Sequence, residues 1–466
     1  MLPEINRGVR AGPLEWVYSQ QSQLFSDQLE GSSAHYNMPG ALRLTGVLNK
    51  AALGGALEKI LSRHEVLRSR FVGQGESVCQ VVMQDYELPL RQVDLREVAE
   101  VEAELEAYIA EEAGRPFDLS ADVLLRSTLL QVADEEHVLL FNLHHIASDG
   151  WSMGILVEEF AHWYAWFHQG NTEGLPELPV QYADYASWQR GWLQGEVLAS
   201  RLEYWRAQLA DMPLLHGLPL DYVRPARQTF KGQQQTMTLS PSLSQSLKSL
   251  AESEGVTLFM LLQTAFAVLL GRYSNNDDIV MGSPVAGRQH EEVESLIGFF
   301  VNTLVLRTRL DGQACFRELL QSNRKTLLEA FAHQDVPFEM LVEQLRPQRS
   351  LSHHPLVQIM FSVQSLDEQA LSLPELEIAS VGSLEARSEF DLELSVYESK
   401  QSLLLQWRHS ESLFSTETIN RLITSFEHLL HHIVTDTEQR VGELSLLSVQ
   451  EHASLSHLPV VQHAGD

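Results

Sequence analysis

Hydrophobic and polar positions divide the chain up to residue 169 into alternating strand-like and helix-like segments. Residues 41–49 alternate apolar and polar positions, as a half-exposed strand does, whereas residues 50–63 repeat their apolar positions at helical spacing. Gly114 follows a charged helical pattern and is predicted to cap that helix. The other segments predicted in this half are strands at 64–83, 123–132 and 136–143, helices at 96–113 and 150–168, and turns at 73–76 and 133–136.

The stretch 169–180 is dense in Gly, Pro and small polar residues, which is typical of a linker. After it, the alternation of helix-like and strand-like patterns begins afresh. Helices are predicted at 196–210, 242–253, 257–273, 316–331 and 416–435, and strands at 234–239, 278–281, 302–309, 356–363, 390–397 and 402–409. The sequence therefore predicts two mixed α/β lobes, residues 1–175 and residues 176–466.

Composition narrows the class of protein further. The 466 residues are 44% hydrophobic, so the chain is neither disordered nor collagen-like and is long enough to bury more than one core. It carries 33 Lys and Arg against 62 Asp and Glu, a net charge of −29. Because the sequence has no basic stripe to match phosphates, nucleic acid is not an expected partner.

Cysteine usage and apolar runs indicate the compartment. Cys79 and Cys315 lie far apart, so neither a disulfide framework nor a CxxC zinc site is predicted, and reduced thiols are expected. The N-terminus has no apolar stretch typical of a signal peptide, and no apolar run reaches the roughly 18–20 residues that span a bilayer. We therefore predict a cytoplasmic location and no membrane partner.

The segment 137–160, HVLLFNLHHIASDGWSMGILVEEF, carries the clearest candidate chemistry. A β-rich run ends at His144, and a helix begins near Gly150. Adjacent residues on a strand point to opposite faces, so one of His144 and His145 is predicted to face a cavity and the other the interior. Asp149 can cap the helix or receive a charged partner, and the free N–H groups at the helix start can attract developing negative charge.

Three interpretations of the histidine pair are open on these residues alone. The pair can be buried and purely structural. It can bind a metal with Asp149 as a third ligand, but no further His, Asp or Glu set completes a shell, so no metal is expected. In the third interpretation, one histidine acts as a general base or stabilises a transition state, and a structural aspartate holds it in place.

These residues resemble a known family. HHIASDG (144–150) matches HHxxxDG, the signature of the condensation domains of nonribosomal peptide synthetases, which are relatives of chloramphenicol acetyltransferase. Further stretches resemble the family in the right order: RHEVLRSRF (63–71), GRPFDLSADVLLRSTLL (114–130), YADYASWQR (182–190), MGSPVAGRQHEEVESLIGFFVNTLVLR (281–307) and HQDVPFEMLVEQLRP (333–347). The resemblance covers the chain from about residue 13 to residue 450.

One stretch departs from the family pattern. Where the family reads LSxAQxRLWFLDQLEG, this chain has WVYSQQSQLFSDQLEG (16–31), with Ser22 and Leu24 at the usual Arg and Trp positions. The following SSAHYNMP (32–39) returns to type. The segment helps to pack the first lobe in the family, so the departure bears on local packing and subclass. We expect it not to touch the HHIASDG turn.

The resemblance implies both a fold and a reaction. It implies two chloramphenicol-acetyltransferase-like lobes that form a V-shaped pseudo-dimer around a central substrate tunnel. In the reaction, the α-amine of an aminoacyl group on an acceptor carrier domain attacks a donor acyl thioester, which forms an amide. No cofactor is expected to bind directly, because the phosphopantetheine arms belong to the partner carrier domains. The domain is expected to be a monomeric part of a larger synthetase.

The resemblance also implies roles for the residues of the turn. His145 would face the channel and bind the attacking amine or stabilise the intermediate, and His144 would lie inward as a structural residue. Asp149 would pair with Arg288 of the second lobe and orient the turn rather than transfer protons. Gly150 would give the backbone room, with its N–H directed at the developing oxyanion.

The remaining candidates are expected to have less direct roles. Trp151 and Ser152 continue the motif, and Trp151 is expected to pack rather than react. Asn302 either lines the site or is purely structural. The histidines that occur in groups elsewhere in the chain, His353, His354, His428, His431 and His432, are expected to be surface or core residues rather than ligands.

Several functional classes stay open. A starter domain would take a fatty acyl donor, with acyl-CoA as its source, whereas an elongating domain would take an aminoacyl or peptidyl donor from a donor carrier domain. Met1 lies close before the first matching residue, which fits a starter and equally fits a piece of a longer chain. Epimerisation and heterocyclisation domains are disfavoured, because DGWSMG and SPVAGRQ favour condensation and a DxxxxD turn is missing. A stand-alone acyltransferase that uses coenzyme A thioesters stays open too, as does a non-catalytic docking module.

Overall fold

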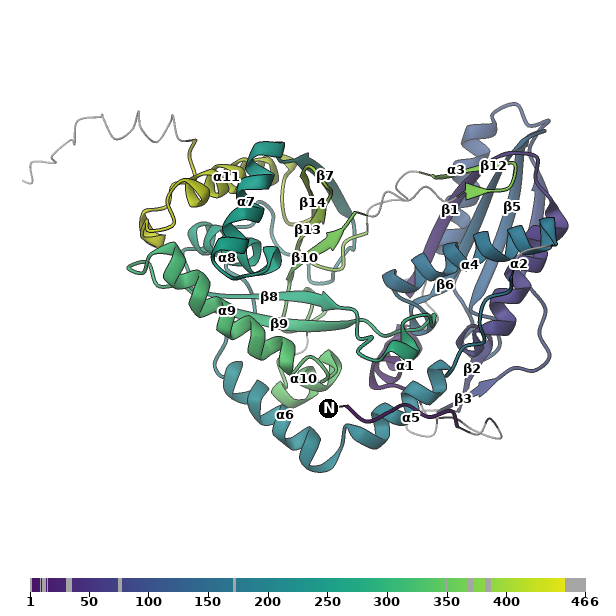
Figure 1. Ribbon diagram of the computed structural model, residues 1–466, viewed down its shortest axis with the longest axis horizontal. Coiled ribbons are helices and arrows are strands. Elements are labelled where there is room, and N and C mark those ends of the chain that lie inside the picture. Colours follow the sequence, from purple (N-terminus) through teal and green to yellow (C-terminus); the bar gives the residue numbers. More distant parts are fainter. Residues whose placement is uncertain are drawn as a thin grey trace, which may run out of the picture. The chain divides into compact units, whose positions relative to one another are not determined.

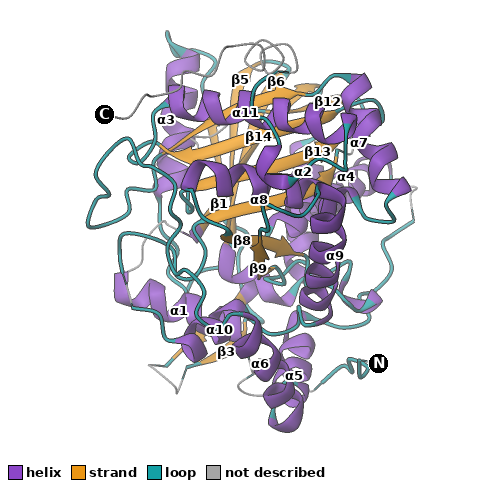
Figure 2. Ribbon diagram, turned by 90° about the vertical axis from the view of Figure 1, so that its left-hand side faces the viewer, coloured by secondary structure: helices purple, strands orange, loops and turns teal. Residues whose placement is uncertain are grey.

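The computed structural model describes residues 2–8, 10, 14, 16–30, 36–73, 78–170, 173–348, 350–366, 372–381 and 387–448. Contacts divide the chain into two units, which Figures 1 and 2 show in two views. Unit 1 comprises Met1–Arg201, Ala286–Asn302 and Glu368–Leu384, and unit 2 comprises Leu202–Val285, Thr303–Asp367 and Glu385–Asp466. Each unit has its own six-stranded sheet flanked by helices, so the predicted mixed α/β class is confirmed.

The unit 1 sheet has the strand order β11-β12-β1-β6-β5-β4, in which β4 and β5 run parallel and all further neighbours run antiparallel. Its strands are β1 (Asn37–Gly46), β4 (Leu90–Asp94), β5 (Leu125–Ala133), β6 (Glu136–His144), β11 (Ser372–Leu373) and β12 (Leu376–Ser380). On one face, Leu139 of β6 shares a core with Leu53 of α2 (Lys50–Arg63) and Phe160 of α4 (Gly150–Gln169). On the opposite face, Leu140 packs with Leu105 of α3 (Val101–Gly114). Both faces of β6 are thus buried, which explains its continuous apolar run.

Smaller elements complete unit 1. They are α1 (Tyr18–Glu30), a hairpin of β2 (Ser69–Val72) and β3 (Cys79–Val82), α5 (Tyr182–Trp192) and the first half of α6 (Gly195–Gln208). A 3-10 turn, Glu65–Arg68, precedes β2, so the predicted strand 64–83 begins later than expected. Of the turn predicted at 73–76, residues 74–76 lie outside the described part of the chain.

The unit 2 sheet has the order β7-β14-β13-β10-β8-β9. Its strands are β7 (Gly232–Thr238), β8 (Asp278–Val285), β9 (Asn302–Arg309), β10 (Ile359–Ser365), β13 (Leu392–Glu398) and β14 (Leu403–Ser410), and its remaining helices are α7 (Pro241–Ser253), α8 (Leu258–Ser274), α9 (Phe316–Ala332), α10 (Phe338–Leu345) and α11 (Thr416–Thr435). Buried aromatic rings pack the helices against the sheet. The ring centroid of Phe266 in α8 lies 5.7 Å from that of Phe361 in β10, 5.8 Å from that of Trp407 in β14 and 6.1 Å from that of Phe426 in α11.

No single helix in the described ranges is long and apolar enough to cross a bilayer; α7 and α8 meet that test as a pair, with a bend of 108° between them.

The two units repeat one arrangement of strands. The series β1-β6-β5-β4 in unit 1 and β7-β14-β13-β10 in unit 2 share the same neighbours and directions: antiparallel, antiparallel, parallel. The pairing register also agrees: the first residue of β1, Asn37, lies opposite the last residue of β6, His144, and the first residue of β7, Gly232, lies opposite the last residue of β14, Ser410. In both units a helix of 20 residues then begins six residues further on. Ser410 therefore occupies in unit 2 the position that His144 occupies in unit 1.

Hydrophobic periodicity located most elements well. The helices predicted at 50–63 and 416–435 and the strand predicted at 302–309 have the observed bounds. The helix predicted at 96–113 starts later, at Val101, because Asp94 binds the Arg96 N–H and guanidinium and holds the preceding residues in turns. The elements that the pattern did not predict include α1, α5, α10, β4, β11 and β12.

The units do not divide at residue 175, the boundary that the sequence predicts. The chain stays in unit 1 through α5, because Tyr182 is buried in the unit 1 core. Two later segments return to the same unit. Residues 286–302 bury Val293 and Leu296 there, and the Ile297 N–H binds His64 Nδ1 at 3.3 Å. Strand β12 pairs with β1. The V-shaped arrangement and the tunnel stay predictions.

Candidate active site

The HHIASDG turn joins the end of β6 to the start of α4, two elements of unit 1 that are labelled in Figure 1. β6 ends at His144, a 3-10 turn covers His145–Ala147, and α4 begins at Gly150. Asp149 caps the helix, since its Oδ1 accepts a hydrogen bond from the Ser152 N–H at 2.9 Å. The positive end of the α4 dipole therefore lies beside the two histidines.

His145 is the half-buried member of the pair, and its hydrogen bond fixes its tautomer. Nδ1 lies 2.6 Å from the carbonyl oxygen of Ser148. Because a carbonyl oxygen accepts only, the proton must lie on Nδ1, and Nε2 of the neutral ring keeps its lone pair. The His145 ring also contacts the Phe299 ring, with 4.5 Å between centroids. The turn thus presents Nε2 of His145 as its basic atom.

His144 lies inward and is fully buried. Its Nδ1 accepts a hydrogen bond from the Ile146 N–H at 3.0 Å, and the Phe117 ring packs edge-on at 5.9 Å. Burial lowers the pKa of His144 to about 3, with the neighbouring His145 contributing less. The ring is therefore neutral near pH 7, and its hydrogen bond to the Ile146 N–H supports the turn from the buried side.

The carboxylate of Asp149 is 1% exposed and accepts hydrogen bonds at both oxygens. Oδ2 accepts from the N–H groups of Phe300 and Val301 at 2.9 and 3.0 Å. Oδ1 accepts from the Ser152 N–H and hydroxyl, each at 2.9 Å, and from Arg288 Nη2 at 3.3 Å. All of these donors are main-chain or side-chain groups of α4 or of the segment 286–302. Asp149 therefore joins the start of α4 to that segment.

Arg288 lies in unit 1 and not in the second lobe, where the sequence predicts it, because the segment 286–302 packs into the unit 1 core. Its Nη2 donates to the Ser152 Oγ at 2.8 Å, and its Nη1 donates to the carbonyls of Val293 and Leu296 at 2.9 and 2.5 Å. The guanidinium also lies over the Phe300 ring, 4.3 Å from its centroid. Burial lowers the pKa of Arg288, and the charge of Asp149 opposes that shift.

The remaining candidates differ in exposure and surroundings. Gly150 is exposed, and a Cβ added there would meet no protein atom within 4 Å, so the fold itself does not require glycine at this position. Trp151 is 56% exposed, with its Nε1–H directed at the Glu294 carbonyl at 3.3 Å. Ser152 is fully buried, and Asn302 is the first residue of β9.

Two residues that support the site, Gln20 and Tyr182, were not predicted from the sequence. Gln20 of α1 is fully buried and donates from Nε2 to the Ile146 carbonyl at 3.0 Å. The expectation that the divergent segment 16–31 does not touch the turn is therefore wrong. Gln20 occupies the Gln position of the family pattern, which was the available signal. Tyr182 of α5 donates its hydroxyl proton to the Phe299 carbonyl at 2.6 Å.

The histidine groups outside the turn lie in unit 2. His354 packs between the Phe338 and Phe390 rings, and burial lowers its pKa. On α11, Nδ1 of His428 and Nε2 of His432 lie 3.1 and 2.8 Å from the Leu446 and Leu447 carbonyls. Within the described ranges, no three His, Cys, Asp or Glu side chains are grouped so that they could hold a metal ion.

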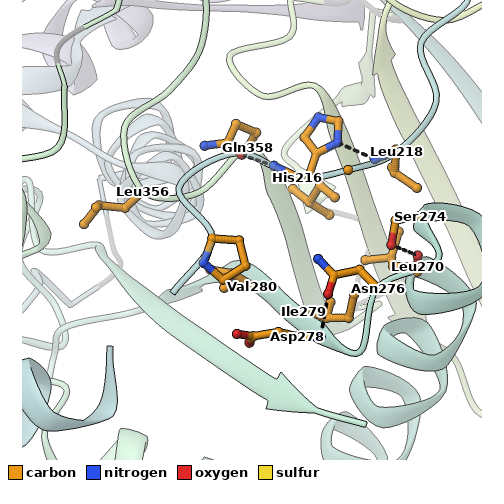
Figure 3. A pocket seen from close by; sticks show the side chains of 13 residues that line it. His216, Leu218, Leu270, Ser274, Asn276, Asp278, Ile279, Val280, Leu356 and Gln358 are labelled. Atoms are coloured by element: carbon orange, nitrogen blue, oxygen red, sulfur yellow. Dashed lines mark hydrogen bonds between the residues drawn. The ribbon is translucent and has the colours of Figure 1, made fainter. Parts of the chain in front are cut away.

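A small cavity in unit 2, shown in Figure 3, is too small for a substrate. Its volume is about 20 Å³, room for a water molecule. Both ring nitrogens of His216 on its wall are engaged: Nδ1 accepts from the Leu218 N–H at 3.1 Å, and Nε2 lies 2.6 Å from Asp391 Oδ2. Arg224 also binds Asp391, at 2.8 Å. This cluster is therefore structural.

Comparisons with known proteins agree with the motifs. The model of the family described as condensation domain matches residues 11–456. A linear gramicidin synthase subunit of Brevibacillus parabrevis is 45% identical over 438 residues, which are 93% of this chain and 6% of that protein. The X-domain in its complex with OxyB from teicoplanin biosynthesis superposes with a TM-score of 0.87 at 28% identity, over 96% of this chain and 99% of that chain. The four-domain nonribosomal peptide synthetase AB3403 superposes with a TM-score of 0.83 at 24% identity, over 95% of this chain and 35% of that chain.

The chain belongs to the condensation domain family of nonribosomal peptide synthetases. Its mixed α/β fold is that of the solved condensation domains, so the predicted chloramphenicol-acetyltransferase-like fold is confirmed. The chain spans only a small part, 6%, of the length of the gramicidin synthase subunit that it matches. Domains of this family act on substrates that carrier domains hold on phosphopantetheine arms.

The depressed pKa of His144 predicts how folding stability depends on pH. The unfolded chain binds a proton at His144 with a pKa of about 6.5, whereas the folded chain binds it at about 3. Between these values the unfolded state holds more protons, so the free energy of unfolding falls as the pH is lowered, by about 2 kcal/mol from pH 7 to pH 5. Urea unfolding of the wild type and of His144→Asn, which keeps an acceptor for the Ile146 N–H, should show a loss that is larger in the wild type by about this amount, because other buried histidines such as His137 and His354 contribute equally in both proteins. Equal pH dependence in both proteins would refute the burial argument.

Proposed function

We propose that this domain catalyses amide-bond formation between a donor acyl thioester and the α-amine of an aminoacyl group on an acceptor carrier domain. The observation that carries the proposal is the hydrogen bond from His145 Nδ1 to the Ser148 carbonyl. This bond places the proton of the neutral ring on Nδ1 and leaves the lone pair of Nε2 available as a base. Nε2 can accept a hydrogen bond from the attacking amine and take up its proton. The intact HHIASDG turn and its anchoring by Asp149 support the same conclusion.

The reaction needs modest chemical help from the protein. The amine nitrogen attacks the thioester carbonyl, the C–S bond breaks, and the thiol of the donor arm leaves while the amine loses a proton. An α-amine has a pKa of about 8, so an appreciable fraction is free base near neutral pH. Placing two tethered reactants together supplies most of the rate, and proton transfer at His145 adds about 10²- to 10⁴-fold. The Gly150 N–H at the start of α4 is suited to the developing oxyanion.

The donor is either a fatty acyl group, as in starter domains, or an aminoacyl or peptidyl group on a donor carrier domain. Both donors present the same thioester and pantetheine arm, so the chemistry at His145 is common to them. The domain would work in the cytoplasm, as part of a larger synthetase.

Recruitment is a second candidate function. The X-domain that resembles this chain with a TM-score of 0.87 was solved in complex with OxyB. By analogy, a domain of this fold can serve as a docking platform for another protein while its substrates react elsewhere. In that case the hydrogen-bonding state of His145 would have no catalytic consequence.

The first test measures transfer directly. The protein is mixed with an aminoacyl-loaded acceptor carrier and, in separate reactions, with a fatty acyl-CoA or an aminoacyl-loaded donor carrier, and the acceptor is read by intact mass. We expect one donor to extend the acceptor, and His145→Ala to slow this extension by about 10²- to 10⁴-fold because the proton acceptor is removed. His431→Ala on α11 is the matched control and should keep the wild-type rate.

The donor that reacts assigns the subclass: an acylated acceptor mass identifies a starter domain, and a dipeptidyl mass identifies an elongating one. If neither donor is used, or if His145→Ala reacts as fast as the wild type, the catalytic proposal fails and recruitment becomes the leading function.

Alanine variants of two glycines in α4, Gly150 and Gly154, test whether substrate passes the start of the helix. A Cβ at Gly150 or at Gly154 would meet no protein atom within 4 Å, so Ala is sterically tolerated by the fold at both positions. Gly150→Ala should lower the transfer rate by about 10- to 100-fold, because its methyl group enters the space that the reactants need. Gly154→Ala should have the wild-type rate, and both variants should unfold at or above the wild-type temperature. Equal rates for both variants would remove Gly150 from the site.

A further inference from the structure

The ring of Phe299 packs against the imidazole of His145. The two ring centroids lie 4.5 Å apart, at an angle of 53° between the planes. Phe299 is 8% exposed and belongs to the unit 1 core. Such a contact between an aromatic ring and an imidazole is favourable and excludes water from one side of the ring.

The main chain on both sides of Phe299 is held by hydrogen bonds. Its own carbonyl accepts the Tyr182 hydroxyl proton at 2.6 Å, and the next two N–H groups, of Phe300 and Val301, bind Asp149 Oδ2 at 2.9 and 3.0 Å. On the N-terminal side, the Gly298 N–H donates to the Ser152 Oγ at 3.0 Å. The backbone that carries the Phe299 ring is thus fixed to the start of α4 and to α5.

Gly298 allows this close approach. A Cβ at this position would lie 2.5 Å from Tyr182 Cδ2 and 2.6 Å from Phe300 Cε2, so a larger residue would push the segment away from α5. The position of the Phe299 ring is therefore set by the packing of the segment and not by the ring alone.

His145 needs a second restraint besides its hydrogen bond. The Nδ1 bond to Ser148 is a single contact on a half-buried side chain, and the imidazole can leave it by rotating about its side-chain bonds. A ring packed against the imidazole blocks part of that rotation. A fixed Nε2 is the condition for efficient proton transfer, since the acceptor must lie within hydrogen-bond distance of the amine.

We propose that Phe299 is a positioning residue for the reaction: its ring holds the His145 imidazole in the rotamer in which Nδ1–H binds the Ser148 carbonyl and Nε2 is available to the amine. This inference rests on the amide-forming function proposed above. It also gives Asp149 a second effect, since its Oδ2 fixes the main chain from which the Phe299 side chain projects.

The test compares Phe299→Ala, Phe299→Leu and Phe299→Tyr in single-turnover transfer with the reactive donor and a range of acceptor concentrations. We expect Phe299→Ala to lower the maximal rate by about 10- to 100-fold, because the base is misplaced, with the acceptor half-saturation changed by less than about twofold. Phe299→Leu should be intermediate, and Phe299→Tyr should recover most of the rate. Phe167→Ala, which removes a 41% exposed ring at the C-terminal end of α4, should retain the wild-type rate.

A second readout separates positioning from general stability and from activity itself. The ¹⁵N chemical shifts of the His145 ring, assigned with His145→Gln, report which nitrogen carries the proton. In the wild type and Phe299→Tyr we expect the pure Nδ1–H tautomer, and in Phe299→Ala an averaged signal. Because Ala can loosen the core, Phe299→Leu is measured in parallel and should show a smaller change of the same kind.

The two readouts distinguish the possible failures. If the wild type transfers no donor, the proposed function fails, while the ¹⁵N shifts still report on the contact. If the wild type is active and Phe299→Ala keeps both its rate and its His145 shifts, the positioning inference is overturned. A folded Phe299→Ala that changes only the acceptor half-saturation also contradicts it, because the ring would then contact substrate rather than the base.

Discussion

The rest of the site depends on the hydrogen bonds that the buried carboxylate of Asp149 accepts. It caps α4, and in the segment 286–302 it binds two main-chain N–H groups and pairs with Arg288, so two parts of unit 1 that are distant in sequence meet at its two oxygens. A buried ion pair of this kind adds little net stability compared with an apolar core. Breaking it is nevertheless costly, about 3–5 kcal/mol, because the remaining charge stays buried without its partner. The pair therefore specifies an arrangement more than it stabilises the fold.

This arrangement divides the work between neighbouring residues. His144 is buried and neutral, and its Nδ1 accepts one main-chain hydrogen bond, whereas His145 donates from Nδ1 and keeps Nε2 open. The difference follows from the point at which β6 ends: His144 is its last residue and keeps a buried position, whereas His145 begins the 3-10 turn and is half-buried. In unit 2 the equivalents of His144 and His145 are Ser410 and Glu411, so unit 2 has no histidine at either position of the repeat. The repeat thus supplies the scaffold, and individual residues supply the function.

The sequence predicted local elements and the turn well, because both depend on residues close together in the chain. Apolar spacing located α11 and α2, and the strand before His144 identified a strand-to-helix turn. Contacts distant in sequence were not visible in the hydrophobic pattern, and the pair of Asp149 and Arg288 was expected only from the family resemblance. The return of residues 286–302 to unit 1, and with it the true environment of Arg288, depends on packing against Tyr182 and the start of α4. Gln20 was missed for the same reason: its partner, the Ile146 carbonyl, lies 126 residues away.

Hydrogen–deuterium exchange at the Phe300 and Val301 amides, compared between the wild type and Asp149→Asn, tests this account most directly. In the wild type both amides donate to Asp149 Oδ2 and should exchange slowly. In Asp149→Asn we predict faster exchange across 286–302, with α11 of unit 2 still protected as an internal reference. Unchanged exchange in this segment, in a variant that nevertheless loses transfer activity, would contradict the account, because Asp149 would then act in the chemistry rather than hold the site together.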